Sequence, residues 1–211
     1  MKTLLFTLFC LLPLAHGAAP QLSPGDQKIE DIALSDTGDF PVRSGTVKLQ
    51  RISAGLRYKK VVFVKAKVYV AQLFGSDPGK FKRSETDALP SLKEQKNVAI
   101  HLTFLRGVDA ETIQKAYLDG VRENGFSAEE PGVKEFLAAA GAGGDGKEGS
   151  IIAISAERMK DGTEHISYVG PNGKTSEIDG PAGLIAKVFS IFLGKTTDSG
   201  LESLKKDLTA N

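Results

Sequence analysis

The sequence contains a single cysteine, Cys10, and this residue lies in an apolar stretch near the N-terminus. Met1 to Gly17 has the layout of a secretory signal, with an apolar run from Leu4 to Leu14 and a small-x-small cleavage site at Ala15-His-Gly17. Cleavage before Ala18 would remove the cysteine, so we expect neither a disulfide nor thiol chemistry in the mature chain. A cysteine-free exported protein fits a bacterial periplasm better than a small extracellular scaffold built on disulfides. We therefore expect a periplasmic or secreted protein.

Long hydrophobic runs are also missing. The apolar run of the signal has about eleven residues, whereas a bilayer span needs about 20. The mature chain is therefore expected to have no stable transmembrane span.

Several other chemistries lack the residues that they need. The formal net charge of +1 falls to about zero without Lys2, and there is no block of basic residues interleaved with aromatics, so nucleic acid is not an expected partner. His101 and His165 have no His, Cys or carboxylate at ligand spacing, and we expect no metal site. The glycine-rich segment from Gly141 to Gly149 lacks a Walker or dinucleotide pattern, so no cofactor is expected. A Gly-x-Ser-x-Gly elbow is absent, which removes support for serine-hydrolase chemistry.

A length of 211 residues, 41% of them hydrophobic, suits one domain with a real core. Residues 18–28 contain Pro and Gly and are predicted to be a disordered leader, and residues 29–211 form the domain. Strands are predicted where apolar and polar residues alternate, at 47–53, 61–70, 97–105, 150–156 and 163–169. Residues 171–180 are predicted to be a turn region.

Helices are predicted between and after these strands. The first starts at Asp109 as N-cap and ends before Gly125, and a shorter one covers 133–140. Pro181 opens a third, and Ser199 with Glu202 makes a capping-box pattern for the last. Because these elements show no βαβ regularity, the fold class is predicted to be α+β, with an antiparallel sheet and helices packed on one face.

Arg57 is the most informative candidate for a site. It lies just before the apolar strand predicted for 61–70, where an unpaired buried cation would be too costly. It must therefore keep contact with solvent, pair with an acid, or bind an anionic ligand, and its planar donor fork suits a carboxylate or a phenolate. Tyr117 and Asn124 are two helical turns apart and project to one side of their helix. The structural alternatives are a surface or salt-bridged Arg57, a core Tyr117 and a C-capping Asn124.

If these three groups share a pocket, Arg57 and Tyr117 hold the polar end of a small hydrophobic carboxylate or phenolic ligand. A few convergent polar groups in an apolar cavity are typical of small-molecule sites. The apolar wall would then be formed by Val62, Val64, Phe189, Ile191 and Phe192.

Three segments in this order resemble the chalcone isomerase superfamily. Gly55-Leu-Arg57 precedes a strand containing Lys67-Val-Tyr69, and Ala116-Tyr117 is followed by Asn124 on one helix. The likeness extends to a late helix ending Phe-Leu-Gly194 and covers roughly 47–208. It is strongest to the bacterial chalcone isomerase-like proteins, and it implies an open-faced antiparallel β-sheet with helices packed on one face.

The resemblance also implies a chemistry. In chalcone isomerases the Arg stabilises the attacking phenolate, the Tyr helps to polarise the ketone through water, and hydroxyl residues on the strand and the late helix hold the substrate. The matching positions here are Val64 and Ile191, with Ser190 adjacent. Because Val64 and Ile191 carry no hydroxyl group, the sequence resembles the fatty-acid-binding members of the superfamily more than its isomerases. We therefore expect non-catalytic binding of a fatty acid or similar hydrophobic carboxylate.

Two alternatives stay open. One is a chalcone-flavanone isomerase-type intramolecular lyase, in which Arg57, Tyr117 and Asn124 would be catalytic. The other is an envelope interaction module without a ligand.

Overall fold

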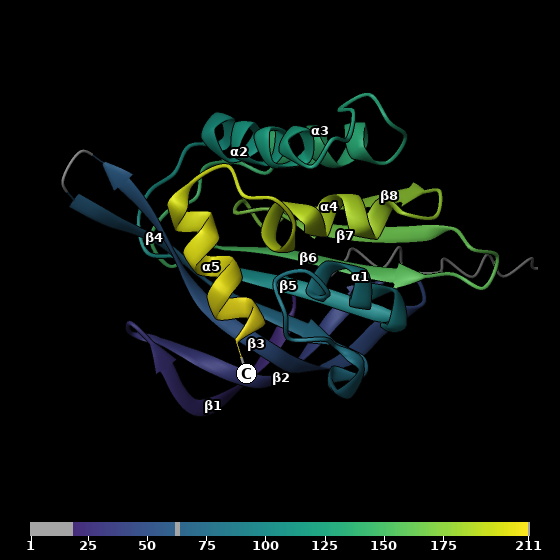
Figure 1. Ribbon diagram of the computed structural model, residues 1–211, viewed down its shortest axis with the longest axis horizontal. Coiled ribbons are helices and arrows are strands. Elements are labelled where there is room, and N and C mark those ends of the chain that lie inside the picture. The colour runs from purple at the N-terminus through teal and green to yellow at the C-terminus, as the bar shows by residue number, and fades with distance from the viewer. Residues whose placement is uncertain (1–18, 62–63, 211) are drawn as a thin grey trace, which may run out of the picture.

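The computed structural model describes residues 19–61 and 64–210 (Figure 1). The signal expected at residues 1–17 lies outside them. The described strands are β1 (Gln21–Ile29), β2 (Ile32–Val42), β3 (Gly45–Val61), β4 (Val64–Gly75), β5 (Asn97–Phe104), β6 (Ile151–Arg158), β7 (Glu164–Val169) and β8 (Thr175–Gly180). The described α-helices are α1 (Ala88–Ser91), α2 (Ala110–Glu123), α3 (Val133–Ala142), α4 (Leu184–Leu193) and α5 (Ser199–Thr209). Within this part of the chain, no helix has the length and apolar character needed to cross a membrane.

The strands form one open, eight-stranded antiparallel sheet whose spatial order is the order of the chain, β1 to β8. Each strand pairs antiparallel with the next one along the chain. Most of these pairs are joined by short turns, whereas α2 and α3 lie in the long connection between β5 and β6. The α+β class predicted from the sequence is therefore confirmed.

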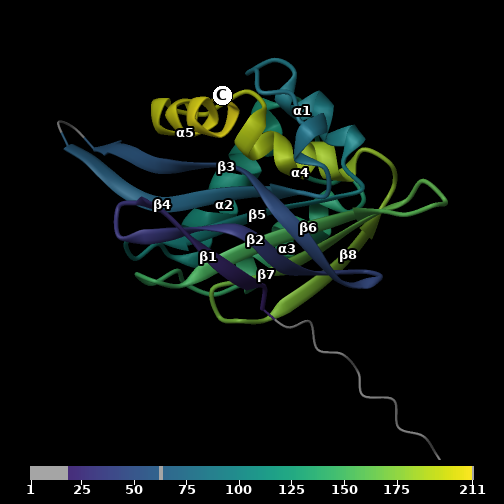
Figure 2. The ribbon, with the colours of Figure 1, turned by 90° about the horizontal axis from the view of Figure 1, so that it is seen from below.

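The main core lies between one face of the sheet and the helices (Figures 1 and 2). Every second residue of β5 faces this core, namely Val98, Ile100, Leu102 and Phe104, as the alternation predicts. Helix α4 buries every residue except Ala186 and Lys187, which are half-buried, and α5 lies across β3. Helix α2 buries Ile113, Tyr117, Gly120 and Val121 at the spacing that the 3.6-residue period predicts.

The other face of the sheet is partly covered by β2, which contacts β4, β6 and β7. A smaller apolar cluster, Phe40, Leu49, Phe74 and Ala99, fills this side. The turn after β2 is joined to β6, because both the backbone N–H and the hydroxyl of Ser44 donate to the Glu157 carboxylate, at 3.0 and 2.9 Å. His101, which alternates with the core-facing residues of β5, is buried on this side with 5% of its surface exposed.

Two segments predicted to lack regular structure are strands. Residues 18–28, expected to be a disordered leader, contain most of β1, which pairs with β2 through shifts in register around Pro24. Because β1 is an edge strand, Pro24 removes no hydrogen bond from the sheet interior. Residues 171–180, predicted to be a turn region, contain the edge strand β8.

The strand predicted for residues 61–70 is also wrong in its extent. The chain reverses inside it, because β3 ends at Val61 and β4 begins at Val64, and the two pair as a hairpin. No Gly, Asn, Asp or Pro marks this reversal, so the usual sequence signal of a hairpin turn is missing.

Candidate functional site

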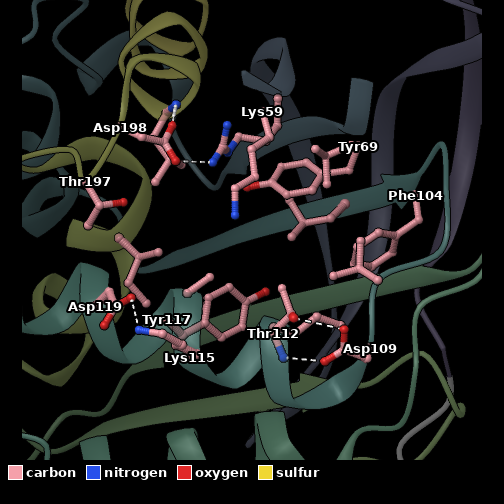
Figure 3. Close-up of a pocket in the computed structure, with 18 of the residues that line it drawn as sticks. Lys59, Tyr69, Phe104, Asp109, Thr112, Lys115, Tyr117, Asp119, Thr197 and Asp198 are labelled. Atoms are coloured by element: carbon pink, nitrogen blue, oxygen red, sulfur yellow. Dashed lines mark hydrogen bonds and ion pairs between the residues drawn. The ribbon is translucent and has the colours of Figure 1, made fainter. Parts of the chain in front are cut away.

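A cavity of about 520 Å³ lies between α2, strands β3 to β5 and the connection from α4 to α5 (Figure 3). This volume is within the range of roughly 300–1,000 Å³ that is usual for small-molecule sites. Its apolar walls come from five elements and include Val68, Leu102, Phe104, Ile113, Ile191 and Leu201. The site is thus built where the helix layer and the sheet do not fill the space between them.

Charged side chains surround the opening. We call these residues the rim: the exposed Lys59, Arg106, Asp109 and Lys115 and the half-buried Asp119. Lys115 pairs with Asp119 at 2.8 Å, and Asp109 caps α2 by accepting from the Thr112 backbone N–H at 2.7 Å. Lys59 and Arg106 have no carboxylate partner among the described residues. The rim therefore has a surplus of positive charge that favours an anion.

Arg57 lines the same cavity from β3, with 8% of its surface exposed. Its guanidinium donates to Asp198 at 2.6 Å and to the carbonyl oxygen of Tyr58. The sequence left open whether Arg57 pairs with an acid or binds a ligand, and the structure pairs it with an acid at the wall of the cavity. Much of its charge is therefore neutralised inside the protein.

Asp198 has two roles. It is the N-cap of α5, because its carboxylate accepts from the backbone N–H groups of Gly200 and Leu201 at 2.9 and 3.0 Å. Burial alone would raise the pKa of Asp198, but the hydrogen bonds from Arg57 and from these N–H groups lower it below its usual value. The N-cap of α5 is therefore Asp198, and not Ser199 as the capping-box pattern suggested. The same carboxylate holds Arg57 against the start of this helix.

Two glycines allow α5 to lie this close to β3. A methyl group on Gly200 would overlap the carbonyl oxygen of Tyr58 and the guanidinium of Arg57. A methyl group on Gly55 would lie 2.5 Å from the Cβ of Asp207 on α5. This explains the Gly-x-Arg sequence in structural terms. Gly55 leaves room for α5, and the N-cap of α5, Asp198, binds Arg57.

Two tyrosines bring hydroxyl groups to the cavity, Tyr69 from β4 and Tyr117 from α2. In Figure 3 the ring of Tyr117 projects from α2 toward the space that Tyr69 and Asp198 border from the other side. The Tyr117 ring stacks on Phe136, with centroids 5.5 Å apart, and meets Phe192 edge-on. Its hydroxyl is buried and has no hydrogen-bond partner in the described part of the chain.

Both hydroxyls are neutral donors at physiological pH. Burial raises the pKa of Tyr117 well above its usual value, with smaller contributions from Tyr168 and Tyr69. Burial also raises the pKa of Tyr69 to about 12, although the adjacent Arg57 guanidinium acts in the opposite direction. Because leaving a buried hydroxyl unpaired costs about 1–3 kcal/mol, the Tyr117 hydroxyl is a natural anchor for a polar ligand group.

The structure brings together only part of the predicted site. Arg57, Tyr117 and Ile191 line the cavity. Asn124 does not line it and instead caps α2, since its side-chain amide donates to the carbonyl of Gly120 and its oxygen accepts from the Lys195 N–H. This is the C-capping alternative that the sequence left open.

The predicted apolar wall is mostly elsewhere. Val64 lies near the end of the β3–β4 hairpin with 67% of its surface exposed, and Val62 is outside the described residues. Phe189 and Phe192 belong to the main core and do not line the cavity, although Phe192 supports the Tyr117 ring. Ile191, and not its neighbour Phe192, lines the cavity. Because nearly every residue of α4 is buried, its hydrophobic pattern does not reveal which face meets the cavity.

Sequence reasoning gave no site role to Tyr69, Asp198 or Lys59. Tyr69 belongs to the Lys67-Val-Tyr69 segment that carries the family resemblance. Its position opposite Arg57 follows only from the β3–β4 hairpin, which the sequence did not predict. Asp198 had a local signal, since an Asp directly before a helix is a preferred N-cap. Its pairing with Arg57, 141 residues away, has no signal in a single sequence.

Comparisons with known proteins support the fold. No family model matches the sequence, and no curated protein matches it. Among solved structures, the chain is similar to the crystal structure of an Arabidopsis thaliana fatty-acid binding protein, with a TM-score of 0.51 and 13% sequence identity over 76% of this chain and 86% of that one. At this identity the likeness concerns the fold alone, and it agrees with the α+β arrangement of an open antiparallel sheet and helices.

Proposed function

We propose that this chain is a non-catalytic binding protein of the periplasm that holds a fatty acid or a similar hydrophobic carboxylate in the cavity. The observation that carries the proposal is the buried hydroxyl of Tyr117, which has no hydrogen-bond partner in the described chain. It lies at an apolar cavity whose rim holds two cations, Lys59 and Arg106, that have no carboxylate partner in the same residues. A few polar groups in an otherwise apolar space fix one end of a ligand and leave the rest to hydrophobic contact.

The polar groups suggest how the carboxylate is held. Arg57 already pairs with Asp198, so it contributes hydrogen-bond donors more than net charge. The neutral hydroxyls of Tyr117 and Tyr69 can donate to a carboxylate without losing a proton, because burial raises the pKa of both. Lys59 and Arg106 add the net positive potential that attracts the anion to the rim.

The apolar lining fits the remainder of such a ligand. Leu102 and Phe104 from β5, Ile113 from α2 and Leu201 from α5 present hydrocarbon surface around the cavity. Each methylene group moved from water into such surroundings gains about 0.8 kcal/mol. The fatty-acid binding activity named for the Arabidopsis structure is consistent with this use of a similar fold.

An isomerase has less support. The resemblance requires hydroxyl groups at the positions of Val64 and Ile191, and neither side chain has one. Val64 is also exposed at the hairpin, away from the cavity lining. The cavity therefore supports ligand binding better than it supports isomerase chemistry.

The test is calorimetric titration of the mature protein with a series of saturated fatty acids, using Tyr117→Phe and a matched control. Tyr168→Phe is that control, because the Tyr168 hydroxyl is also buried and unpartnered in the described chain, and its ring also packs on Phe136, but it does not line the cavity. Tyr117→Phe should weaken binding about fivefold, the value of one neutral hydrogen bond, and Tyr168→Phe should leave it unchanged. Equal losses in both variants, or no binding of any fatty acid by the wild type, would refute the proposal.

The periplasmic location has a separate test. N-terminal sequencing of the exported protein should return a chain that begins at Ala18. A chain that begins at Met1 would mean that the signal is retained and would contradict this part of the proposal.

A further inference from the structure

The β3–β4 hairpin extends beyond the body of the molecule (Figures 1 and 2). Near its end, Lys59 and Lys60 on β3 and Lys65 and Lys67 on β4 are all exposed. Val64 lies among them, and it is the one large hydrophobic side chain that is strongly exposed in the described part of the chain, at 67%. We call these five residues the lysine end; residues 62–63, outside the described chain, are not part of it.

The lysine end carries charge that the protein itself does not neutralise. Lys60 and Lys65 are direct partners across the two strands, and like charges directly opposite each other destabilise a sheet. Lys67 pairs with Glu30 at 2.5 Å, and the Lys65 ammonium lies 4.6 Å from the ring centroid of Tyr58. Lys59 and Lys60 have no carboxylate partner among the described residues. An anionic surface would relieve this repulsion.

We propose that the lysine end docks on a bilayer surface that carries anionic headgroups. The lysines supply the electrostatic attraction, and Val64 supplies an apolar side chain that can enter the boundary between headgroups and acyl chains. A nucleic acid or an acidic protein surface would satisfy the lysines but has no comparable apolar layer for Val64. The combination of cations with one exposed apolar group therefore favours a lipid surface.

The docking surface is continuous with the cavity, because Lys59 belongs both to the lysine end and to the rim. A docked molecule would have its cavity opening close to the bilayer, and a hydrophobic carboxylate could pass between the two with little exposure to water. This transfer depends on the proposed function, whereas the docking itself does not.

The first experiment is co-sedimentation of the mature protein with vesicles of phosphatidylcholine, with and without phosphatidylglycerol. We expect binding only to the anionic vesicles and a loss of binding as salt is added. Lys60→Gln with Lys65→Gln should weaken it about thirtyfold, which is about fivefold per lysine. The control is Lys93→Gln with Lys160→Gln, which removes two exposed lysines near the start of β5 and the end of β6, at the opposite end of the sheet.

Several outcomes would overturn the proposal. They are equal binding to both kinds of vesicle, no binding to either, or equal losses in the two double variants. Neither Lys60 nor Lys65 lines the cavity, so fatty-acid titration of their double variant should match the wild type. A protein that docks but binds no fatty acid would refute the proposed function and leave the docking surface intact.

A second experiment locates the contact. The chain has no tryptophan, so Val64→Trp introduces a single fluorophore at an exposed position. Its emission should shift to shorter wavelength when anionic vesicles are added, whereas the emission of Lys160→Trp should not change. Vesicle binding without a shift from Val64→Trp would mean that another surface makes the contact, and the proposal would fail.

Discussion

Replacing Asp198 by Asn should lower the stability of the protein while it strengthens binding of a carboxylate. The substitution removes the charge that faces Arg57 but keeps an oxygen that can accept from the N–H groups of Gly200 and Leu201, so the cap of α5 remains. Arg57 would then lie at the cavity wall without its counter-charge. The same change thus affects folding and binding in opposite directions.

The magnitude follows from the exposure of the two side chains, 10% for Arg57 and 39% for Asp198. Breaking a fully buried pair costs about 3–5 kcal/mol, whereas an exposed pair contributes about 0.2–1 kcal/mol. This pair lies between these limits, and we expect Asp198→Asn to lower the free energy of unfolding by about 1–3 kcal/mol. Asp198→Ala should cost about 1 kcal/mol more, because the helix cap is also lost. Removing the negative charge should tighten fatty-acid binding about fivefold, after discounting for solvent screening.

The assay is urea denaturation followed by circular dichroism, extrapolated linearly to water, together with fatty-acid titration of the same variants. Asp119→Asn is the control, because it removes a rim carboxylate from an exposed pair with Lys115, and its effect on unfolding should stay below about 0.5 kcal/mol. The reasoning would be refuted if Asp198→Asn were as stable as the wild type and bound fatty acids no more tightly.

Three further predictions concern other parts of the molecule. Burial alone would lower the pKa of His165, but its hydrogen bonds to Glu177 and Asp179, both 2.6 Å, raise this pKa overall. The stabilisation from these bonds should be complete below about pH 6.5 and should fall as the pH rises through the raised pKa. In His165→Gln the free energy of unfolding should not depend on pH in this way. Gly200→Ala should destabilise the protein by at least about 2 kcal/mol in urea denaturation, because α5 must move away from β3. Gly79→Ala should have little effect, because its methyl group would make only an ordinary contact, 3.5 Å from an Asp77 carboxylate oxygen. The wild type should cyclise chalcone at the uncatalysed rate in an absorbance assay, and rapid turnover would make the protein an enzyme.

The sequence predicted best those elements whose signals are local. Helix α2 combines a 3.6-residue apolar stripe with Asp109 as N-cap and Gly125 after its end, and the structure has all three. Strand β5 alternates cleanly, and its apolar residues face the core as expected. In these segments the periodicity, the cap and the burial all favour the same element.

The errors occur where tertiary contacts outweigh the local pattern. The alternation through residues 61–70 continues across a reversal that no turn residue marks, so the hairpin looked like one strand. Pro24 and the polar residues around it suggested disorder, yet an edge strand accepts them. For the site, the two-turn spacing suggested that Tyr117 and Asn124 share a pocket, but it could not decide between that role and a C-capping Asn124, which is the role that the structure shows.

The arrangement of the sheet has a consequence for the order in which the protein folds. Neighbouring strands are neighbours in the sequence, and the pairs β1–β2, β2–β3, β3–β4, β6–β7 and β7–β8 each close a short loop, so these hairpins can form soon after their residues are available. The pair that closes the cavity wall joins residues 141 positions apart, and loops of that length close late. A growing chain would therefore form these hairpins before the cavity wall is complete, and the wall would close only when α5 docks on β3.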